Sequence, residues 1–267
     1  MPLKRLALFS YLFAFALSTF AQQPSIASSP PQPVRDTQAV AVLQSAIAAM
    51  GGSAAVVAVL DVTVQGTLEN ATGARGQAVG FVWKAAGSEF RQEFQTDGTT
   101  TRIYVSGHGS PRDLRGSAWV SVPYHESRAV LPYQVPALVL LNELGNSNYT
   151  VSYVGAATIN GRPAIQIHTC DESDFISHIV LAQDWFFDAQ TAVPLQVNFK
   201  LPSDTAANDP RDGSIQFSNF QISNGISVPM QLALQEGNGS ATAIVSSVQF
   251  NSGVPASEFD PPTGSDQ

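Results

Sequence analysis

The sequence has 267 residues, of which only 13% are charged, about half the share of a typical soluble protein. Its formal net charge is −8, and no stretch gathers lysine and arginine into a basic cluster. Because nucleic-acid binding depends on such clusters to replace phosphate counterions, the composition excludes a nucleic-acid partner. A single cysteine, Cys170, excludes an internal disulfide, so the core alone must stabilise the fold.

The N-terminal segment has the three parts of a signal peptide. Lys4 and Arg5 precede an apolar run over residues 6–17, and Thr19 and Ala21 supply small residues for cleavage. A membrane anchor is the alternative, but the run is shorter than the roughly 20 residues that cross a bilayer. We therefore expect a signal peptide over residues 1–21. The exported chain, with a net charge of −10, is expected to be periplasmic or otherwise secreted, and not membrane-spanning.

The next segment, residues 22–35, is rich in proline, serine and glutamine, which predicts a flexible linker. A helix is then expected to start at the N-cap Asp36 and to end at Gly51 and Gly52. Its apolar residues recur at helical spacing, at Val40, Leu43, Ile47 and Met50. Residues 53–58 predict one further short turn of helix.

From residue 60 onward the hydrophobic period changes to two. Leu60, Val62, Val64 and Leu68 alternate with polar residues, which predicts a half-buried strand. Turns at residues 70–76, 86–87 and 97–98 separate further strands, and residues 107–116 predict a loop followed by a strand at 118–122. Leu138, Leu141 and Leu144 then share one face of a short buried helix.

The second half of the chain returns to strands and tight turns. Alternating segments begin near residues 149, 165, 185, 195, 215, 230 and 243, and Asn160-Gly161 and Asn224-Gly225 predict hairpin turns. The expected fold class is mainly β (α+β), a strongly curved antiparallel sheet or half-open β-barrel of about 10–11 strands covered by two short helical segments. A single β domain is expected over residues 36–262, with a disordered tail at 263–267.

Metal-type side chains gather in one place, between His168 and His178. His168 and Cys170 project from the same side of an extended strand, and the rest of the group is Asp171, Glu172, Asp174 and His178. The alternative interpretation is an exposed acidic loop with Cys170 as a small core residue, and it is the one adopted: no metal site is predicted, and a metal-dependent enzyme ranks third among the hypotheses.

No other segment has the pattern of an active site. His108 lies near Ser110, but the Gly-x-Ser-x-Gly turn of hydrolases is absent, and Glu89 and Glu93 flank Arg91 as a solvated charge cluster on a strand. No phosphate-binding loop is present. We therefore predict no catalytic residues, no cofactor and no enzymatic activity.

Aromatic and aliphatic side chains, by contrast, are abundant on the predicted strands. An ordinary filled core accounts for many of them, but a curved sheet of this size encloses more volume than two short helices fill. Part of this surface is therefore predicted to line an apolar ligand cavity. The predicted lining residues are Val62, Val64, Phe81, Trp83, Phe90, Phe94, Trp119, Leu138, Leu141, Trp185, Phe187 and Phe199.

The order of several short motifs resembles that of the periplasmic lipoprotein-carrier superfamily, the LolA/LolB-like proteins and their outer-membrane lipoprotein-sorting relatives. The motifs that carry this resemblance are Gly51-Gly52, Phe90-Arg91-Gln92-Glu93, Trp119 with Pro123, Asn160-Gly161-Arg162-Pro163, Trp185-Phe186-Phe187-Asp188 with Thr191 and Pro194, Asn224-Gly225 with Pro229, and Phe250-Asn251 with Pro255 and Phe259. The resemblance implies an incomplete antiparallel barrel around a cavity for acyl chains. This chain departs from the family at residues 84–87, where Lys84 stands beside the position of the carriers' arginine.

Together these features predict an exported envelope protein that binds a lipid, a lipoprotein acyl chain or another apolar ligand without catalysis. The alternative is an envelope interaction or stress-sensing module with a filled core and a protein partner.

Overall fold

The computed structural model describes residues 33–69, 78–97, 99–106, 111–115, 118–128, 131–201 and 210–261. All the described residues belong to one compact unit. The predicted signal peptide, most of the predicted linker and the predicted tail fall outside the described residues, as does the turn expected at residues 70–76. Within the described ranges, no helix combines the length and the apolar character that a membrane crossing requires.

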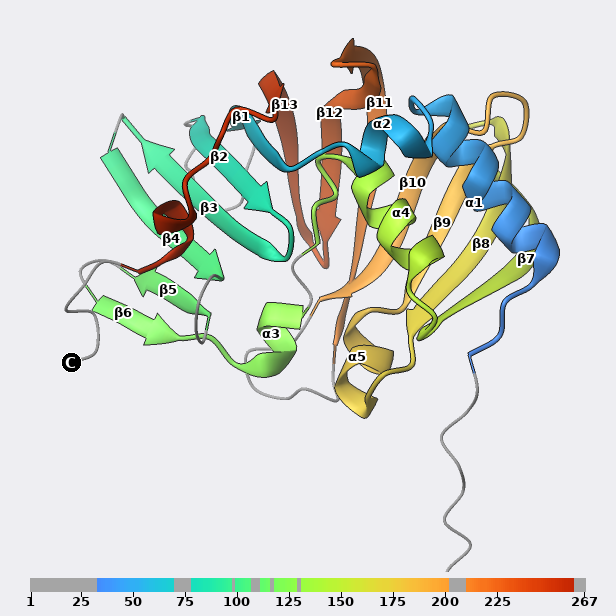
Figure 1. Cartoon of the computed structure of the whole chain (residues 1–267), viewed down its shortest axis with the longest axis horizontal. Coiled ribbons are helices and arrows are strands. Elements are labelled where there is room, and N and C mark those ends of the chain that lie inside the picture. Colours follow the sequence, from blue (N-terminus) through green and yellow to red (C-terminus); the bar gives the residue numbers. More distant parts are fainter. Residues whose placement is uncertain are drawn as a thin grey trace, which may run out of the picture. The chain divides into compact units, whose positions relative to one another are not determined.

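One antiparallel sheet of 13 strands makes up most of the described chain (Figure 1). Its strand order is β6-β5-β4-β3-β2-β1-β13-β12-β11-β10-β9-β8-β7. The chain therefore winds as two meanders, β1 to β6 and β7 to β13, which meet where β1 pairs with β13. The strands are β1 (Asp61–Glu69), β2 (Val79–Ala86), β3 (Glu89–Thr96), β4 (Thr99–Ser106), β5 (Arg112–Arg115), β6 (Ala118–Ser121), β7 (Tyr149–Ile159), β8 (Arg162–Asp171), β9 (Gln183–Asp188), β10 (Pro194–Leu201), β11 (Arg211–Ser223), β12 (Ile226–Glu236) and β13 (Gly239–Phe250).

This architecture confirms the predicted curved antiparallel sheet with short helices, although it has more strands than expected. The prediction of a continuous loop over residues 107–116 is wrong, because β5 pairs with both β4 and β6 inside that range. Leu60 was expected on the buried face of the first strand, but it is 74% exposed. Its backbone N–H donates to Asn251 Oδ1 at 2.7 Å, so β1 begins only at Asp61.

Short helices lie across one face of the sheet and at one end of it (Figure 1). The helix α1 begins where predicted, because the Asp36 carboxylate accepts the backbone N–H groups of Gln38 and Ala39. The helices α3 and α5 were not predicted. The helical elements are α1 (Thr37–Ala49), α2 (Ser53–Val57), α3 (Tyr124–Arg128), α4 (Pro136–Gly145), α5 (Phe175–Val180) and the 3₁₀ helix η1 (Ala256–Phe259).

The helix α4 confirms the predicted buried helix but buries more than the predicted face. Leu138, Leu141 and Leu144 are half-buried, whereas Leu140 and Glu143 are fully buried. The difference arises because α4 contacts α1 and α2 as well as β7 and β12. A helix covered on several sides does not follow a single apolar stripe.

The segment before α1 is anchored to the far edge of the sheet. Asp36 N donates to Val151 O on β7 at 2.9 Å, and Val151 N donates to Val34 O at 2.7 Å. The Arg35 guanidinium donates to four backbone carbonyls at the end of α4 and the start of β7, those of Glu143, Leu144, Asn146 and Tyr149. A cation at the carbonyl end of a helix is stabilising. Arg35 therefore holds the segment before α1 against the C-terminal end of α4.

Candidate functional site: a cleft beneath α4

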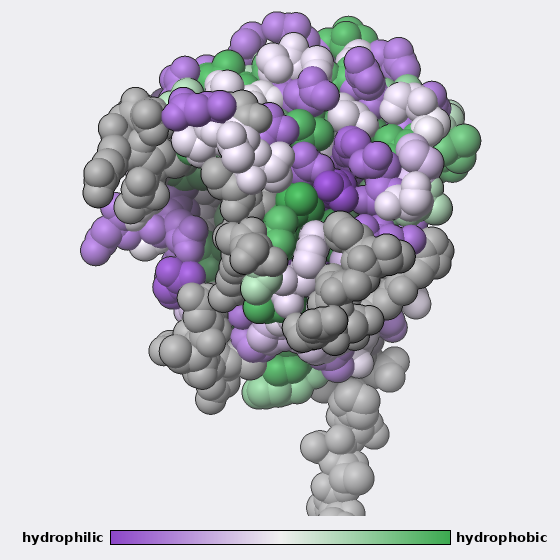
Figure 2. Space-filling view, turned by 90° about the vertical axis from the view of Figure 1, so that its left-hand side faces the viewer, coloured by the Kyte–Doolittle hydropathy of each residue, from purple (hydrophilic) through white to green (hydrophobic). Residues whose placement is uncertain are grey.

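A cleft of about 370 Å³ lies between α4 and the strands β1 to β3, and we call it the α4 cleft. Ten of its lining residues are apolar, and the others are polar residues and one glycine. The apolar lining consists of Val59, Leu60, Val62, Trp83, Ala85, Phe90, Leu131, Pro132, Leu138 and Val139. The remainder is Asp61, Gly87, Ser88, Glu89, Arg128 and Asn142. In Figure 2, which views the molecule from the side of β4 to β6, apolar side chains are visible between polar ones.

The strand register explains why apolar side chains meet in this cleft. Val62 on β1 lies opposite Ala85 on β2, and Ala85 lies opposite Phe90 on β3. Because side chains alternate between the faces of a sheet, these three positions share the face that α4 covers. Phe90 also stacks on Tyr104 of β4, with ring centroids 5.1 Å apart, so its ring is held in place on the cleft wall.

A second hollow of about 310 Å³ adjoins the α4 cleft and extends its polar end. The two share Ser88, Phe90, Arg128, Leu131 and Asn142 as lining residues. At this boundary, Arg128 donates to Asp171 Oδ2 at 2.8 Å and to Ser177 Oγ at 3.2 Å. The cleft therefore combines an apolar interior with a polar end, where Arg128 is ion-paired with Asp171, and this arrangement suits an amphipathic ligand.

The residues predicted from sequence to line a cavity separate into two groups. Val62, Trp83, Phe90 and Leu138 line the α4 cleft. The others lie elsewhere in the fold. Val64 and Phe81 are buried in the main core, Phe94 and Leu141 are half-buried against it, and Trp119 is half-buried on β6.

Trp185, Phe187 and Phe199 belong to an aromatic cluster in the second half of the sheet. Trp185 stacks on Phe187 and on Phe217 at 6.1 and 6.0 Å, and Tyr133 packs against Trp185 at 6.1 Å. Tyr133 also stacks on Phe199, at 4.9 Å. Side chains therefore fill the space next to β9 to β11, and the open space lies toward β1 to β3. Tyr133 and Phe217 are not among the residues predicted from the sequence to line a cavity.

A buried polar group, also missed in the sequence, lies beneath α4. Glu143 is fully buried, and its Oε1 accepts a hydrogen bond from Gln183 Nε2 at 2.8 Å. Burial raises the pKa of Glu143 to about 8, although Thr169, Gln183 and Trp185 around the carboxyl group favour its charged form. Among the described residues, Glu143 Oε2 and Trp185 Nε1 make no hydrogen bond of normal geometry. The one signal in the sequence is an acidic residue within the apolar stretch 135–144.

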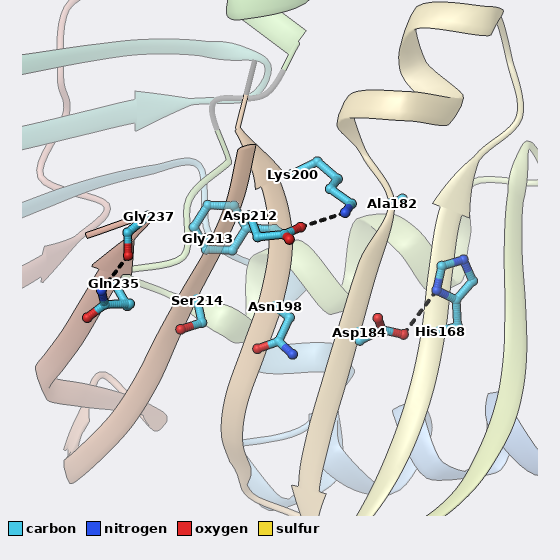
Figure 3. Close-up of a pocket in the computed structure, with 11 residues that line it drawn as sticks. His168, Ala182, Asp184, Asn198, Lys200, Asp212, Gly213, Ser214, Gln235 and Gly237 are labelled. Carbon is cyan, nitrogen blue, oxygen red and sulfur yellow. Dashed lines mark hydrogen bonds and ion pairs between the residues drawn. The ribbon is translucent and has the colours of Figure 1, made fainter. Parts of the chain in front are cut away.

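The outer face of the sheet carries a polar groove of about 510 Å³ across β8 to β12 (Figure 3). His168 Nδ1 lies 3.1 Å from Asp184 Oδ1, and this hydrogen bond lowers the pKa of Asp184. Lys200 pairs with Asp212 at 2.5 Å. Ser214 lies on β11, two strands from Asp184, a separation of roughly 10 Å at the usual strand spacing. The groove therefore does not assemble a nucleophile with the His–Asp pair.

The remaining charged groups noted in the sequence have structural partners. Arg91 pairs with Glu93 on β3. Lys84 pairs with Glu258 of η1 at 2.8 Å and lies on the opposite face from Trp83, away from the cleft. Gly107, His108 and Ser110 lie outside the described residues.

Comparisons with known proteins identify the fold. The structure is similar to a putative outer membrane lipoprotein-sorting protein domain from Vibrio parahaemolyticus, with a TM-score of 0.53 and 14% identity over 83% of this chain and 95% of that one. A DUF1329 family protein from Desulfovibrio piger is similar with a TM-score of 0.55 and 12% identity, over 82% of this chain and 96% of that one. A LolA superfamily protein from Nitrosomonas europaea is similar with a TM-score of 0.54 and 11% identity, over 84% of this chain and 97% of that one. No protein-family model and no curated protein matches the sequence. The resemblance stated from the motifs is confirmed at the level of the fold.

Proposed function

We propose that this protein is an exported, non-catalytic envelope protein that binds a lipid, a lipoprotein acyl chain or another apolar ligand in the α4 cleft. The observation that carries the proposal is the cleft itself, a partly open space of about 370 Å³ with ten apolar lining residues. Small-molecule sites usually have about 300–1,000 Å³ and a mostly apolar lining with a few polar groups. The fold shared with a LolA superfamily protein and a lipoprotein-sorting protein domain supports the same class of ligand.

Burial of hydrocarbon supplies the affinity. Each buried methylene contributes about 0.8 kcal/mol, so eight methylenes in the cleft contribute roughly 6 kcal/mol before the cost of association. A polar head group would lie toward Arg128 and Asn142, at the boundary of the two hollows. Because α4 forms one wall, a small displacement of this helix would control entry of the ligand.

The cleft can be tested by filling it. Ala85 is half-buried and lines the α4 cleft, so Ala85→Phe places a ring in the ligand space. Ala118 is exposed on β6, and Ala118→Phe is the matched control. We expect Ala85→Phe to weaken binding of a fluorescent fatty acid at least tenfold and to remove lipid that co-purifies in native mass spectrometry. The control should bind as the wild type does.

Two results would count against the proposal: purified protein with neither co-purifying lipid nor affinity for the probe, or equal binding by the two variants. The filled aromatic cluster around Trp185 favours the second candidate, an envelope interaction or stress-sensing module with a protein partner. That candidate predicts a protein partner that binds both variants as it binds the wild type. Export is tested separately by the mass of the secreted chain, which should correspond to cleavage after Ala21.

A further inference from the structure

Three metal-type donor atoms converge where β8 passes into α5. Cys170 Sγ lies 3.4 Å from His178 Nδ1, and His178 Nδ1 lies 2.7 Å from Glu172 Oε2. The three donor atoms all lie within 4.8 Å of one another. A tetrahedral zinc ion with a sulfur ligand at about 2.3 Å and a nitrogen ligand at about 2.0 Å separates these two atoms by roughly 3.5 Å. The distance from Cys170 to His178 already fits that geometry.

The chain reversal after β8 brings these residues together. Cys170 is the second-last residue of β8, and Glu172 follows the strand. Asp174 then caps α5 by accepting the backbone N–H of Ser177 at 2.8 Å, which returns the chain over the strand. Cys170 Sγ donates to the backbone carbonyl of His178 at 3.2 Å, so the helix is held against the thiol. Sequence reasoning grouped His168 with these residues, but His168 pairs with Asp184 instead.

The three donors differ in their exposure to solvent. Cys170 is buried, Glu172 is largely buried and His178 is 54% exposed, so an ion can reach the donors from the histidine side. Zinc binds the thiolate form of cysteine, so binding at Cys170 would release the thiol proton to solvent.

The outer contacts orient the ligands as well. Thr150 Oγ1 donates to Glu172 Oε1 at 3.2 Å, which leaves Oε2 directed at the histidine. Hydrogen bonds of this kind fix the carboxylate of a metal site. A thiolate, a carboxylate and a neutral imidazole together carry two negative charges, which balance a divalent ion. Mixed sulfur, nitrogen and oxygen donors favour zinc over calcium or magnesium.

We propose that Cys170, Glu172 and His178 bind a zinc ion, with a fourth position open to water. The site lies on the opposite face of the sheet from Ile167 and Thr169, apart from the α4 cleft, and so does not depend on the proposed ligand binding. It would fasten α5 to β8. Because Arg128 donates to Ser177 on α5, bound zinc would also stiffen the contact at the boundary of the two hollows.

The test uses the exported chain, purified free of metal, and measures zinc affinity by competition with a chromophoric chelator. We expect one equivalent of zinc, and a thiolate-to-cobalt charge-transfer band when cobalt replaces it. Cys170→Ser and His178→Gln should each weaken zinc binding at least tenfold, and Cys170→Ser should remove the cobalt band. His168→Gln, a histidine on the same strand outside the cluster, should bind as the wild type does.

A second readout uses the fact that Cys170 is the only thiol in the chain. One equivalent of zinc should slow alkylation of Cys170 in the wild type and in His168→Gln, but not in His178→Gln. The inference is overturned by an absence of stoichiometric binding, by cobalt spectra without the thiolate band, or by equal losses in His168→Gln and His178→Gln. Circular dichroism identifies any variant that does not fold. Because the His178 side chain is 54% exposed, His178→Gln should leave the packing unchanged, and it is therefore the decisive variant.

Discussion

Glu143 makes the stability of this protein depend on pH in an unusual direction. Its pKa is raised from an ordinary 4.5 to about 8 by burial. Between these two values the unfolded chain ionises this carboxyl group and the folded chain does not, so the unfolded state binds fewer protons. The free energy of unfolding therefore falls as the pH rises from about 4.5 to about 8. The stability that the neutral buried carboxyl group contributes is fully present only below about pH 4.5.

The substitution Glu143→Gln isolates the effect because glutamine has nearly the same shape and does not titrate. One pKa unit corresponds to 1.36 kcal/mol, so the free energy of unfolding of the wild type falls by roughly 5 kcal/mol between the ordinary and the raised pKa of Glu143. Between pH 5 and pH 8 the change is roughly 3–4 kcal/mol. A glutamine at this position still accepts from Gln183 and is expected to lie within about 1 kcal/mol of the wild type at pH 5.

The assay is chemical denaturation of both proteins at pH 5 and pH 8. Every other titrating group is common to the two, so the difference between their unfolding free energies reports Glu143 alone. We expect Glu143→Gln to be the more stable protein at pH 8 by roughly 3 kcal/mol. A difference that stays constant with pH, or a wild type that is the more stable at pH 8, would show that Glu143 is not protonated in the folded protein at neutral pH.

Two further predictions concern the turns. Hydrogen bonds from the Thr191 backbone N–H and from Arg162 hold the pKa of Asp188 at about 2. Asp188→Asn should therefore lower the midpoint of thermal unfolding at pH 7, at a cost in stability of about 1 kcal/mol. This loss of stability should shrink as the pH falls from 3.8 toward 2, and a loss that does not change with pH would contradict the lowered pKa of Asp188. A Cβ on Gly51, where φ is +119°, would lie 2.2 Å from Gly225 O. Gly51→Ala should therefore lower the free energy of unfolding by roughly 3 kcal/mol, as measured by urea denaturation. A change below about 1 kcal/mol would mean that the end of α1 can move away from Gly225 without cost.

The parts of the fold that could be predicted are those with a local physical cause. The strands β1 and β2 were predictable because alternating side chains face the core and the other side of the sheet. The turns at Asn160-Gly161 and Asn224-Gly225 were predictable because both residues of each pair adopt positive φ, as a two-residue hairpin requires. The start of α1 followed from the capping chemistry of Asp36.

The parts that could not be predicted depend on distant neighbours. The strand β5 has four residues and no alternation of its own, and it exists because β4 and β6 pair with it. The division between filled and open space depends on Tyr133, which enters the aromatic cluster from a different part of the chain. The convergence of Cys170 and His178 depends on α5, a six-residue helix with no apolar period long enough to detect.

The pairing of β1 with β13 has a consequence for the order in which the molecule can assemble. Each meander is built from hairpins between successive strands, which form from residues close in sequence. The pairing of β1 with β13 instead joins Val62 to Phe250, which are separated by most of the chain. Contacts so distant in sequence form late and slowly. On the proposed export route, a chain that crosses a membrane from its N-terminus would present β1 with one unsatisfied edge until its last strand arrives. A chaperone that shields this edge would then protect the chain from aggregation.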